Sequence, residues 1–368
     1  MSVGCENSPR WNTDPQVQSV VGRPVSDLLA HRPRRQKLDG FETIYSDFVD
    51  YIVRCTHRIW DEKDVGLIRT HYSADCPVFA PSGKAIGADA MLRGTLSSLS
   101  ASADRSPIAE DVIWSEDEPG VFFSSHRIMS ASAHLGPDAL LGSPRVGDYI
   151  AVPVIADCVC QNNKIIREWL VRDYAQYARS CGIDPRQLAE HLANQDKRGD
   201  DSRHDWLQME RERVLTLGRL EPPIDHPAAP IAQALRWAFE DEYYGRAAHC
   251  ASPSIEVRWP AGRRLIGRGA WIGCMIQLRS PLSQHQYTLD HWAARPLPDG
   301  DVAVALRWWL TGLHAADGVW GKPSGREILI MAISHYRLRG GRVIEDFTVM
   351  DEVSVLRQIA GGLGACRT

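Results

Sequence analysis

The chain has 368 residues, with no long apolar run and no large excess of charge of either sign. No window approaches the roughly 18 uninterrupted apolar residues of a membrane-spanning helix, so no membrane association is expected. Lysine and arginine number 42 against 46 for aspartate and glutamate, a net charge of -4 that disfavours a nucleic-acid binder. Met1–Pro33 is polar and lacks the apolar core of a signal peptide, so the expected location is cytoplasmic.

Cysteine pairs and cofactor motifs are also scarce. The nine cysteines are an odd number, and only Cys158 and Cys160 lie close together, in a strand-like run where alternate side chains point to opposite faces. The sequence shows no metal-ligand spacing, no glycine-rich phosphate loop and no Gly-x-Ser-x-Gly nucleophile motif. We therefore expect no metal, no cofactor and no disulfide framework, and any chemistry is left to side chains alone.

Length and composition favour two globular domains. The apolar fraction of 44% is enough for real hydrophobic cores, and 368 residues exceed the usual size of one domain. Residues 1–40 are rich in proline and basic residues and are predicted to be a flexible tail. A charged, proline-containing stretch over 191–225 is predicted to be a linker. The expected domains are then 41–190 and 226–368.

Each of these domains shows helical patterns followed by strand patterns, the order typical of an α+β fold. In the first domain, helices are predicted over 41–60, 65–71 and 87–99, and strands over 111–114, 121–133, 149–160 and 165–171. In the second domain, helices are predicted over 231–244 and 269–278, and strands over 287–294, 302–313, 327–338 and 343–349.

The two halves align at a nearly constant offset. The Pro81–Gly83 turn corresponds to Pro260–Gly262 at an offset of 179 residues. Arg127 corresponds to Arg307 at 180, and the segment ending in Asp173 corresponds to the segment ending in Asp351 at 178. A shared order of elements at one long period indicates an internal duplication of a whole domain.

Several segments carry a family resemblance. They are Ile59–Asp64, Ser124–Arg127, Ala133–Gly136 and Ile166–Asp173 in the first half, and His314–Gly325 and Val343–Asp351 in the second. Through them each half resembles a SnoaL-like domain, the polyketide-cyclase branch of the nuclear-transport-factor-2-like superfamily. The resemblance implies a cone in which a curved antiparallel sheet wraps around N-terminal helices and encloses a pocket. The family's usual Pro-Thr-Gly loop is altered in both halves, at Pro144–Gly147 and Pro323–Gly325.

The predicted catalytic residues are the aspartates that close the last strand of each half. Period-2 alternation places Asp173 on one face with Trp169 and Val171, and a carboxyl among apolar neighbours has a raised pKa. In SnoaL-like cyclases an aspartate at this position is the acid/base of an intramolecular aldol closure, and Asp173 and Asp351 match it. The alternative is that each aspartate caps the helix that follows the strand.

The remaining site candidates are histidines, arginines and aromatic residues. His134 and His314 occupy equivalent positions at the end of a long strand. An imidazole there could polarise a carbonyl group of a substrate, and the alternative is that it only forms hydrogen bonds with the backbone of the turn. The predicted substrate-binding residues are Trp60, His126, Arg127, Trp169, Arg307 and Phe347. Each arginine has the alternative role of a partner in an ion pair.

The sequence thus favours a cofactor-free acid/base enzyme of the cyclase, isomerase or lyase type, acting on a small, largely apolar carbonyl compound. One alternative is a non-catalytic ligand-binding or scaffold protein. Another is an epoxide hydrolase, which needs an Asp–Arg–Asp group in its pocket. The expected partner is a small-molecule ligand. The two cones are expected to form an intramolecular pseudo-dimer through the convex faces of their sheets, with further self-association left open.

Overall fold

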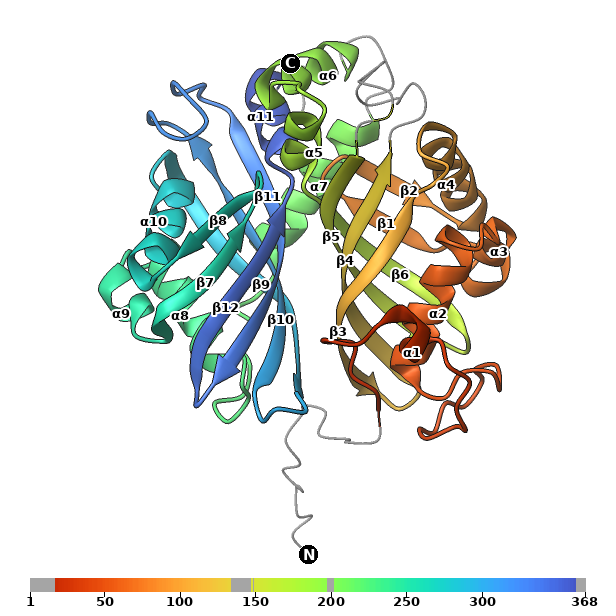
Figure 1. Cartoon of the computed structure of the whole chain (residues 1–368). Coiled ribbons are helices and arrows are strands. Elements are labelled where there is room, and N and C mark those ends of the chain that lie inside the picture. Colours follow the sequence, from red (N-terminus) through yellow and green to blue (C-terminus); the bar gives the residue numbers. More distant parts are fainter. Residues whose placement is uncertain (1–16, 134–146, 148, 197–201, 362–368) are drawn as a thin grey trace, which may run out of the picture.

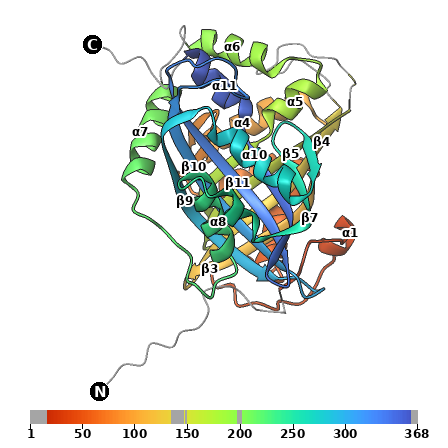
Figure 2. The ribbon, with the colours of Figure 1, turned by 90° about the vertical axis from the view of Figure 1, so that its left-hand side faces the viewer.

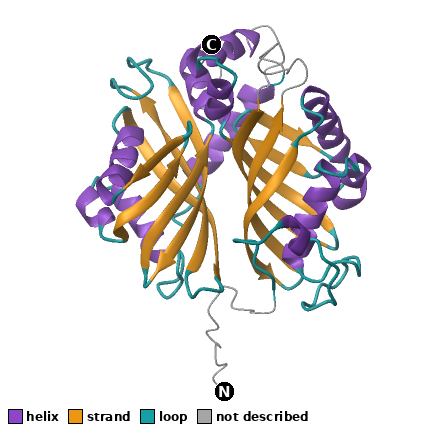
Figure 3. Ribbon diagram, in the orientation of Figure 1, coloured by secondary structure: helices purple, strands orange, loops and turns teal. Residues whose placement is uncertain are grey.

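The computed structural model of the chain describes residues 17–133, 147, 149–196 and 202–361. These residues form two α+β domains, each with helices on one face of a six-stranded sheet. Figures 1 and 3 show the two sheets facing each other at the centre, with the helices on the outer sides. The α+β class and the two tandem cones predicted from the sequence are confirmed.

The first sheet has the strand order β2-β1-β6-β5-β4-β3. Its strands are β1 (Pro77–Ala80), β2 (Gly83–Ile86), β3 (Ser106–Glu118), β4 (Val121–Ala133), β5 (Tyr149–Gln161) and β6 (Lys164–Arg172). All neighbours are antiparallel except β1 and β6, which are parallel. The sheet is therefore mixed, whereas an antiparallel sheet is predicted from the sequence. The long connection from β1 to β6 permits their parallel pairing.

The second sheet repeats this arrangement in the order β8-β7-β12-β11-β10-β9. Its strands are β7 (Ala251–Trp259), β8 (Arg263–Ile266), β9 (Leu282–Pro296), β10 (Val302–His314), β11 (Glu327–Arg339) and β12 (Arg342–Met350). The pair β7 and β12 is parallel, as its counterpart is in the first sheet. Identical strand orders and a conserved parallel pair show that the same topology is built twice.

Equivalent helices cover the inner face of each sheet, which is the face turned away from the other domain. Domain 1 has α2 (Phe48–Trp60), the 3₁₀ helix η1 (Val65–Leu67), α3 (Ile68–His71) and α4 (Ala88–Ala101), and domain 2 has α8 (Ala229–Phe239), α9 (Tyr244–Ala248) and α10 (Arg268–Arg279). Both α4 and α10 begin after a glycine with positive φ, Gly87 at 85° and Gly267 at 100°. A Cβ at Gly87 would lie 2.5 Å from the carbonyl oxygen of Ala74, so this turn requires glycine.

The first long helix starts later than its periodicity predicts. The Asp47 side chain accepts a hydrogen bond from the Asp50 backbone N–H and caps α2, so the helix begins at Phe48 and not near Phe41. Phe41 and Tyr45 precede the helix but are still buried, in the same core as Phe48. Their spacing reflects burial of a loop against the sheet. The sequence pattern of apolar residues does not distinguish such a buried loop from a helix.

The segments outside the two predicted domains are more ordered than expected. Of the predicted tail, α1 (Val25–Leu28) and its neighbours pack on domain 1, where Val20, Leu28 and Leu38 are buried, and residues 1–16 lie outside the described part. The predicted linker holds α7 (Ser202–Thr216) and the end of α6 (Pro185–Asp196), which follows α5 (Tyr174–Ser180) of domain 1, and the described part of the chain ends in α11 (Glu352–Gly361). In Figure 2, α7 runs along one side of the sheets, next to β9.

The two sheets pack through the faces that carry no helices. The shared core joins apolar residues of both domains and of α7, including Trp169 and Trp206 on one side and Trp309 and Phe347 on the other. At its centre the Arg307 guanidinium lies 3.6 Å from the centroid of the Trp169 ring. The interface is therefore continuous and largely buried.

No helix in the described part of the chain has the length and apolar composition needed to cross a membrane.

Candidate functional site

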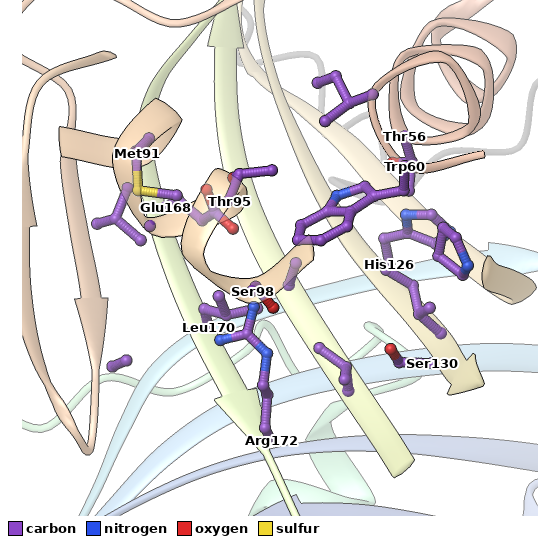
Figure 4. Close-up of a pocket in the computed structure, with 18 of the residues that line it drawn as sticks. Thr56, Trp60, Met91, Thr95, Ser98, His126, Ser130, Glu168, Leu170 and Arg172 are labelled. Carbon is purple, nitrogen blue, oxygen red and sulfur yellow. The ribbon is translucent and has the colours of Figure 1, made fainter. Parts of the chain in front are cut away.

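A cavity of about 470 Å³ lies in domain 1, between the inner face of the sheet and the helices α2 and α4. This volume falls within the range of small-molecule sites. Its lining is mostly apolar, with a few polar groups on β4, β6 and α4. Figure 4 shows Glu168 and Arg172 on one side of the cavity and Trp60 and His126 on the other.

Glu168 is the acidic residue of this lining. It is only 4% exposed, and its Oε2 accepts a hydrogen bond from the Tyr72 hydroxyl at 3.0 Å. Burial raises the pKa of Glu168, against the opposing effects of that hydrogen bond and of the positive charge of Arg172. A carboxyl with a raised pKa in an apolar cavity is suited to accept and return a proton.

His126 on β4 contributes a neutral imidazole. It is 3% exposed, and its buried Nε2 has no hydrogen-bond partner among the described residues. Burial lowers the pKa of His126 to about 3, so the ring is uncharged at neutral pH. Since β5 lies between β4 and β6, His126 and Glu168 stand on strands roughly 10 Å apart, which leaves room for a ligand between them.

Arg172, the last residue of β6, brings a positive charge to the same cavity. The side chain is half-buried and makes no hydrogen bond or ion pair with any residue in the described ranges. In Figure 4 it points into the cavity beside Ser98. A guanidinium without a hydrogen-bond partner among the described residues, next to an apolar wall, is suited to bind a negative charge or a carbonyl oxygen of a ligand.

The corresponding region of domain 2 is filled by larger side chains. The residues equivalent to the cavity lining are Leu306 for His126, Trp308 for Ile128, Leu310 for Ser130, Met275 for Thr95 and Leu278 for Ser98. All five substitutes belong to the continuous apolar core of domain 2 and are at most 2% exposed. The duplication has therefore produced one hollow cone and one packed cone.

The two aspartates predicted to be catalytic lie outside this cavity. Asp173 caps α5: its carboxylate accepts hydrogen bonds from the backbone N–H groups of Gln176 at 2.9 Å and Gly262 at 3.2 Å. Asp351 accepts one from the backbone N–H of Ser354 in the same way, at the start of α11. Burial raises the pKa of Asp173 to about 6 and that of Asp351 to about 7. The geometry matches the capping alternative, and proton transfer by either residue stays a prediction.

The other candidates divide between the cavity and the domain interface. Trp60 and His126 line the cavity. Between the sheets, Arg127 pairs with Glu110 at 3.2 Å and lies over the ring of Phe347, whereas Arg307 lies over Trp169. His314 is fully buried at the end of β10 and bonds to Ser324 through Nδ1, and burial lowers its pKa. His134 lies outside the described residues, as do Pro144–Val146 of the altered loop.

Sequence reasoning missed Glu168 and Arg172, although the alternation rule contained the signal. Trp169, Val171 and Asp173 share one face of β6, so Glu168, Leu170 and Arg172 share the other. The structure turns the first set toward domain 2 and the second set toward the cavity. Because both faces are rich in apolar residues, the alternation alone does not decide which face encloses the ligand.

An Asp–Arg–Asp group is present, but it lies between the sheets. Arg307 Nη1 binds Asp157 Oδ2 and its Nε binds Asp290 Oδ2, both at 2.8 Å. Although burial opposes ionisation, Arg307 and Arg213 lower the pKa of Asp290 to about 2. The described lining of the cavity includes no aspartate, so the constellation required by the epoxide-hydrolase alternative is not assembled there.

Within the described ranges, no group of three or more histidine, cysteine or acidic residues is placed to hold a metal ion.

The position equivalent to Glu168 in domain 2 is Asp346, and it leads to a pH prediction. Asp346 is 1% exposed, accepts hydrogen bonds from Trp271 and Thr348, and has a pKa that burial raises to about 7. A raised folded-state pKa means that folding binds protons, so the free energy of unfolding falls as pH rises from about 4 to about 7. Asp346→Asn should reduce this slope by up to ~1.4 kcal/mol per pH unit.

The measurement is urea unfolding at a series of pH values. Asp39→Asn removes a carboxylate that is exposed on the surface, and it serves as the control variant. Equal slopes for the wild type and Asp346→Asn would show that Asp346 is ionised in the folded protein throughout this range.

Comparison with known proteins gives structural neighbours only. No protein-family model matches the chain, and no curated protein matches it. Among solved structures, a protein named as a polyketide cyclase from Acidithiobacillus ferrooxidans is 20% identical, with 37% of this chain and 96% of the other aligned and a TM-score of 0.31. IdmH from Streptomyces antibioticus, also named as a polyketide cyclase, is 22% identical over 36% of this chain and 97% of its own, with a TM-score of 0.31.

AclR from Streptomyces galilaeus, named as a hydroxylase, is 17% identical over 36% of this chain and 92% of its own, with a TM-score of 0.31. Each of these matches spans about the length of one domain. The tandem arrangement itself is shown by the two sheets of identical strand order.

Proposed function

We propose that domain 1 is a cofactor-free acid/base enzyme of the cyclase, isomerase or lyase type, acting on a small, largely apolar carbonyl compound. The observation that carries this proposal is a mostly apolar cavity of about 470 Å³ with a buried carboxyl, a neutral imidazole and a half-buried guanidinium on its walls. These groups supply a proton acceptor, a hydrogen-bond partner and a positive charge without any cofactor.

Glu168 is the proposed proton-transfer residue. Its carboxylate removes a proton from the carbon next to the substrate's carbonyl group, and the electron pair of that C–H bond moves onto the carbonyl oxygen to give an enolate. The charge of Arg172 stabilises this oxygen, and His126 binds a second polar group of the substrate from the opposite wall. In a cyclase the enolate carbon then attacks a second carbonyl group, and the alkoxide that forms takes up the proton held by Glu168. In an isomerase Glu168 returns the proton to the enolate at a carbon atom.

Glu168 is preferred over Asp173 because of what each carboxylate already binds. Both oxygens of Asp173 accept backbone N–H groups, one from each domain, and the residue is absent from the cavity lining. Glu168 accepts a single hydrogen bond, from Tyr72, and faces the apolar space. Of the two, only Glu168 has an oxygen atom available to a substrate without loss of a helix cap.

The test is exchange of the α-proton of carbonyl compounds for deuterium in D₂O, followed by NMR over a panel of β-keto esters and cyclic ketones. The wild type should catalyse exchange for the compounds that bind, and Arg172→Met should lower the exchange rate about 10²–10³-fold with a small effect on binding. Methionine suits this position because Met350 is its equivalent in domain 2. Binding without any exchange across the panel would favour the non-catalytic ligand-binding alternative.

A further inference from the structure

The interface between the domains has two equivalent sides, and within the described ranges a helix runs along one of them. On one side Trp206 of α7 stacks on Phe79 with ring centroids 6.2 Å apart, and Arg213 of α7 pairs with Asp290 at 3.4 Å. The same helix packs on Trp309 and Met331 of domain 2. Figure 2 shows α7 and β9 on this side, with α5 and β7 on the other. The helix seals this edge of the sheet sandwich with apolar contacts.

The opposite side keeps an open groove of about 450 Å³ at the positions related by the duplication. Its lining includes Met129, Pro153, Arg258 and Phe347, which are equivalent to Trp309, Met331, Phe79 and Trp169 on the covered side. The described residues that line the groove come from both domains, and none belongs to a helix that runs along the sheets as α7 does. The groove is therefore the uncovered counterpart of the α7 site.

The chemistry of this groove differs from that of the α7 side. Four arginines line it, Arg179 from α5 of domain 1 and Arg258, Arg263 and Arg264 from domain 2, and we name it the arginine groove after them. The acidic residue in the described lining is Asp173, whose oxygens are occupied by backbone N–H groups. Four arginines and one capped carboxyl therefore line this groove, in a chain whose net charge is -4.

The guanidiniums of the arginine groove are only partly satisfied by the described residues. Arg258 and Arg263 have carboxylates at 3.8 Å, from Glu110 and Glu352, and Arg263 Nε donates to the carbonyl oxygen of Pro260 at 2.7 Å. Arg179 donates to the carbonyl oxygen of Ala261, and the exposed side chain of Arg264 makes no hydrogen bond or ion pair with a described residue. Convergent guanidiniums with free N–H donors bind phosphate and carboxylate groups strongly and in bidentate geometry.

We propose that the arginine groove binds a small polyanion, a molecule with two or more phosphate or carboxylate groups, and that both domains hold it. The volume of the groove suits a small molecule and not a helix such as α7. The arginines favour a negatively charged ligand, whereas the other side of the interface is covered by the apolar face of α7. The site depends on the tandem arrangement, because Arg179 belongs to one domain and the other three arginines to its partner domain. It is independent of the cavity in domain 1.

The test is isothermal titration calorimetry with inorganic pyrophosphate and with citrate at ~0.15 M ionic strength. At least one of the two should bind, and the affinity should fall as salt is raised. Arg264→Gln should weaken binding about ten-fold, since it removes one charge-assisted contact, and Arg179→Gln/Arg264→Gln should weaken it further. Binding of pyrophosphate alone indicates a phosphate ligand, and binding of citrate alone indicates a carboxylate ligand.

Arg93→Gln provides the matched control, because Arg93 is an exposed arginine on the outer helix α4 and lies outside the groove lining. It should retain wild-type affinity. Arg264→Gln removes no side-chain hydrogen bond or ion pair with a described residue, so a folded variant is expected even if Arg179→Gln disturbs the interface. The proposal is overturned if neither polyanion binds at millimolar concentration, or if Arg264→Gln and Arg93→Gln bind equally well.

Discussion

Glu168→Gln is expected to lower the rate of α-proton exchange by about 10²–10⁴-fold while the carbonyl compound still binds. Glutamine keeps the shape of the side chain and an oxygen that accepts the Tyr72 hydroxyl, but it does not take up a proton. In the wild type, exchange requires the ionised carboxylate. The rate should therefore rise with pH through the raised pKa of Glu168, and this dependence should disappear in the variant.

Asp173→Asn is the matched comparison, since it alters the residue that the family resemblance assigns to proton transfer. The free energy of unfolding should change by less than about 1 kcal/mol, because asparagine is as good an N-cap as aspartate and its side-chain oxygen still accepts the N–H of Gln176. The exchange rate per folded molecule should stay close to that of the wild type. If Asp173→Asn abolishes exchange and Glu168→Gln does not, the acid/base role belongs to Asp173.

The long elements of the fold were predictable because their patterns are strong. The strand 121–133 coincides with β4, and the predicted strands at 149–160 and 302–313 each end within one residue of β5 and β10. The four-residue strands β1, β2 and β8 were missed, since so short a run carries no distinct period. Their turns, Pro81–Gly83 and Pro260–Gly262, were recognised as turns, and the parallel pairing of β1 with β6 is a long-range contact that no local pattern contains.

The candidate site was predictable in part, and the error has a physical cause. Trp60 and His126 were assigned to substrate binding and line the cavity. Trp169 and Phe347 were assigned to the same role but lie in the interface, because the duplication buries the outer sheet faces that a single domain would expose. An aromatic residue on a two-sided apolar strand therefore carries no information about which side holds the ligand.

The difference between the two cones depends on side-chain volumes at equivalent positions, and this gives the second large expected effect. Ser130→Leu combined with Thr95→Met introduces into domain 1 the residues found in domain 2, Leu310 and Met275. The added apolar groups should occupy the cavity and weaken ligand binding by at least about 100-fold, the equivalent of ~2.7 kcal/mol. The free energy of unfolding should be unchanged or higher, since filling a cavity with apolar atoms is favourable.

The control for this double variant is Leu310→Ala, which removes a fully buried side chain from the packed cone of domain 2. It should lower the free energy of unfolding by about 2–5 kcal/mol through loss of apolar burial and formation of a void. Ligand binding in domain 1 should remain, because Leu310 belongs to the core of domain 2 and lies outside the cavity lining. If Ser130→Leu/Thr95→Met still binds the ligand with wild-type affinity, the ligand does not occupy the cavity of domain 1. Equal loss of binding in both variants would instead mean that binding follows overall stability and not the space inside one cone.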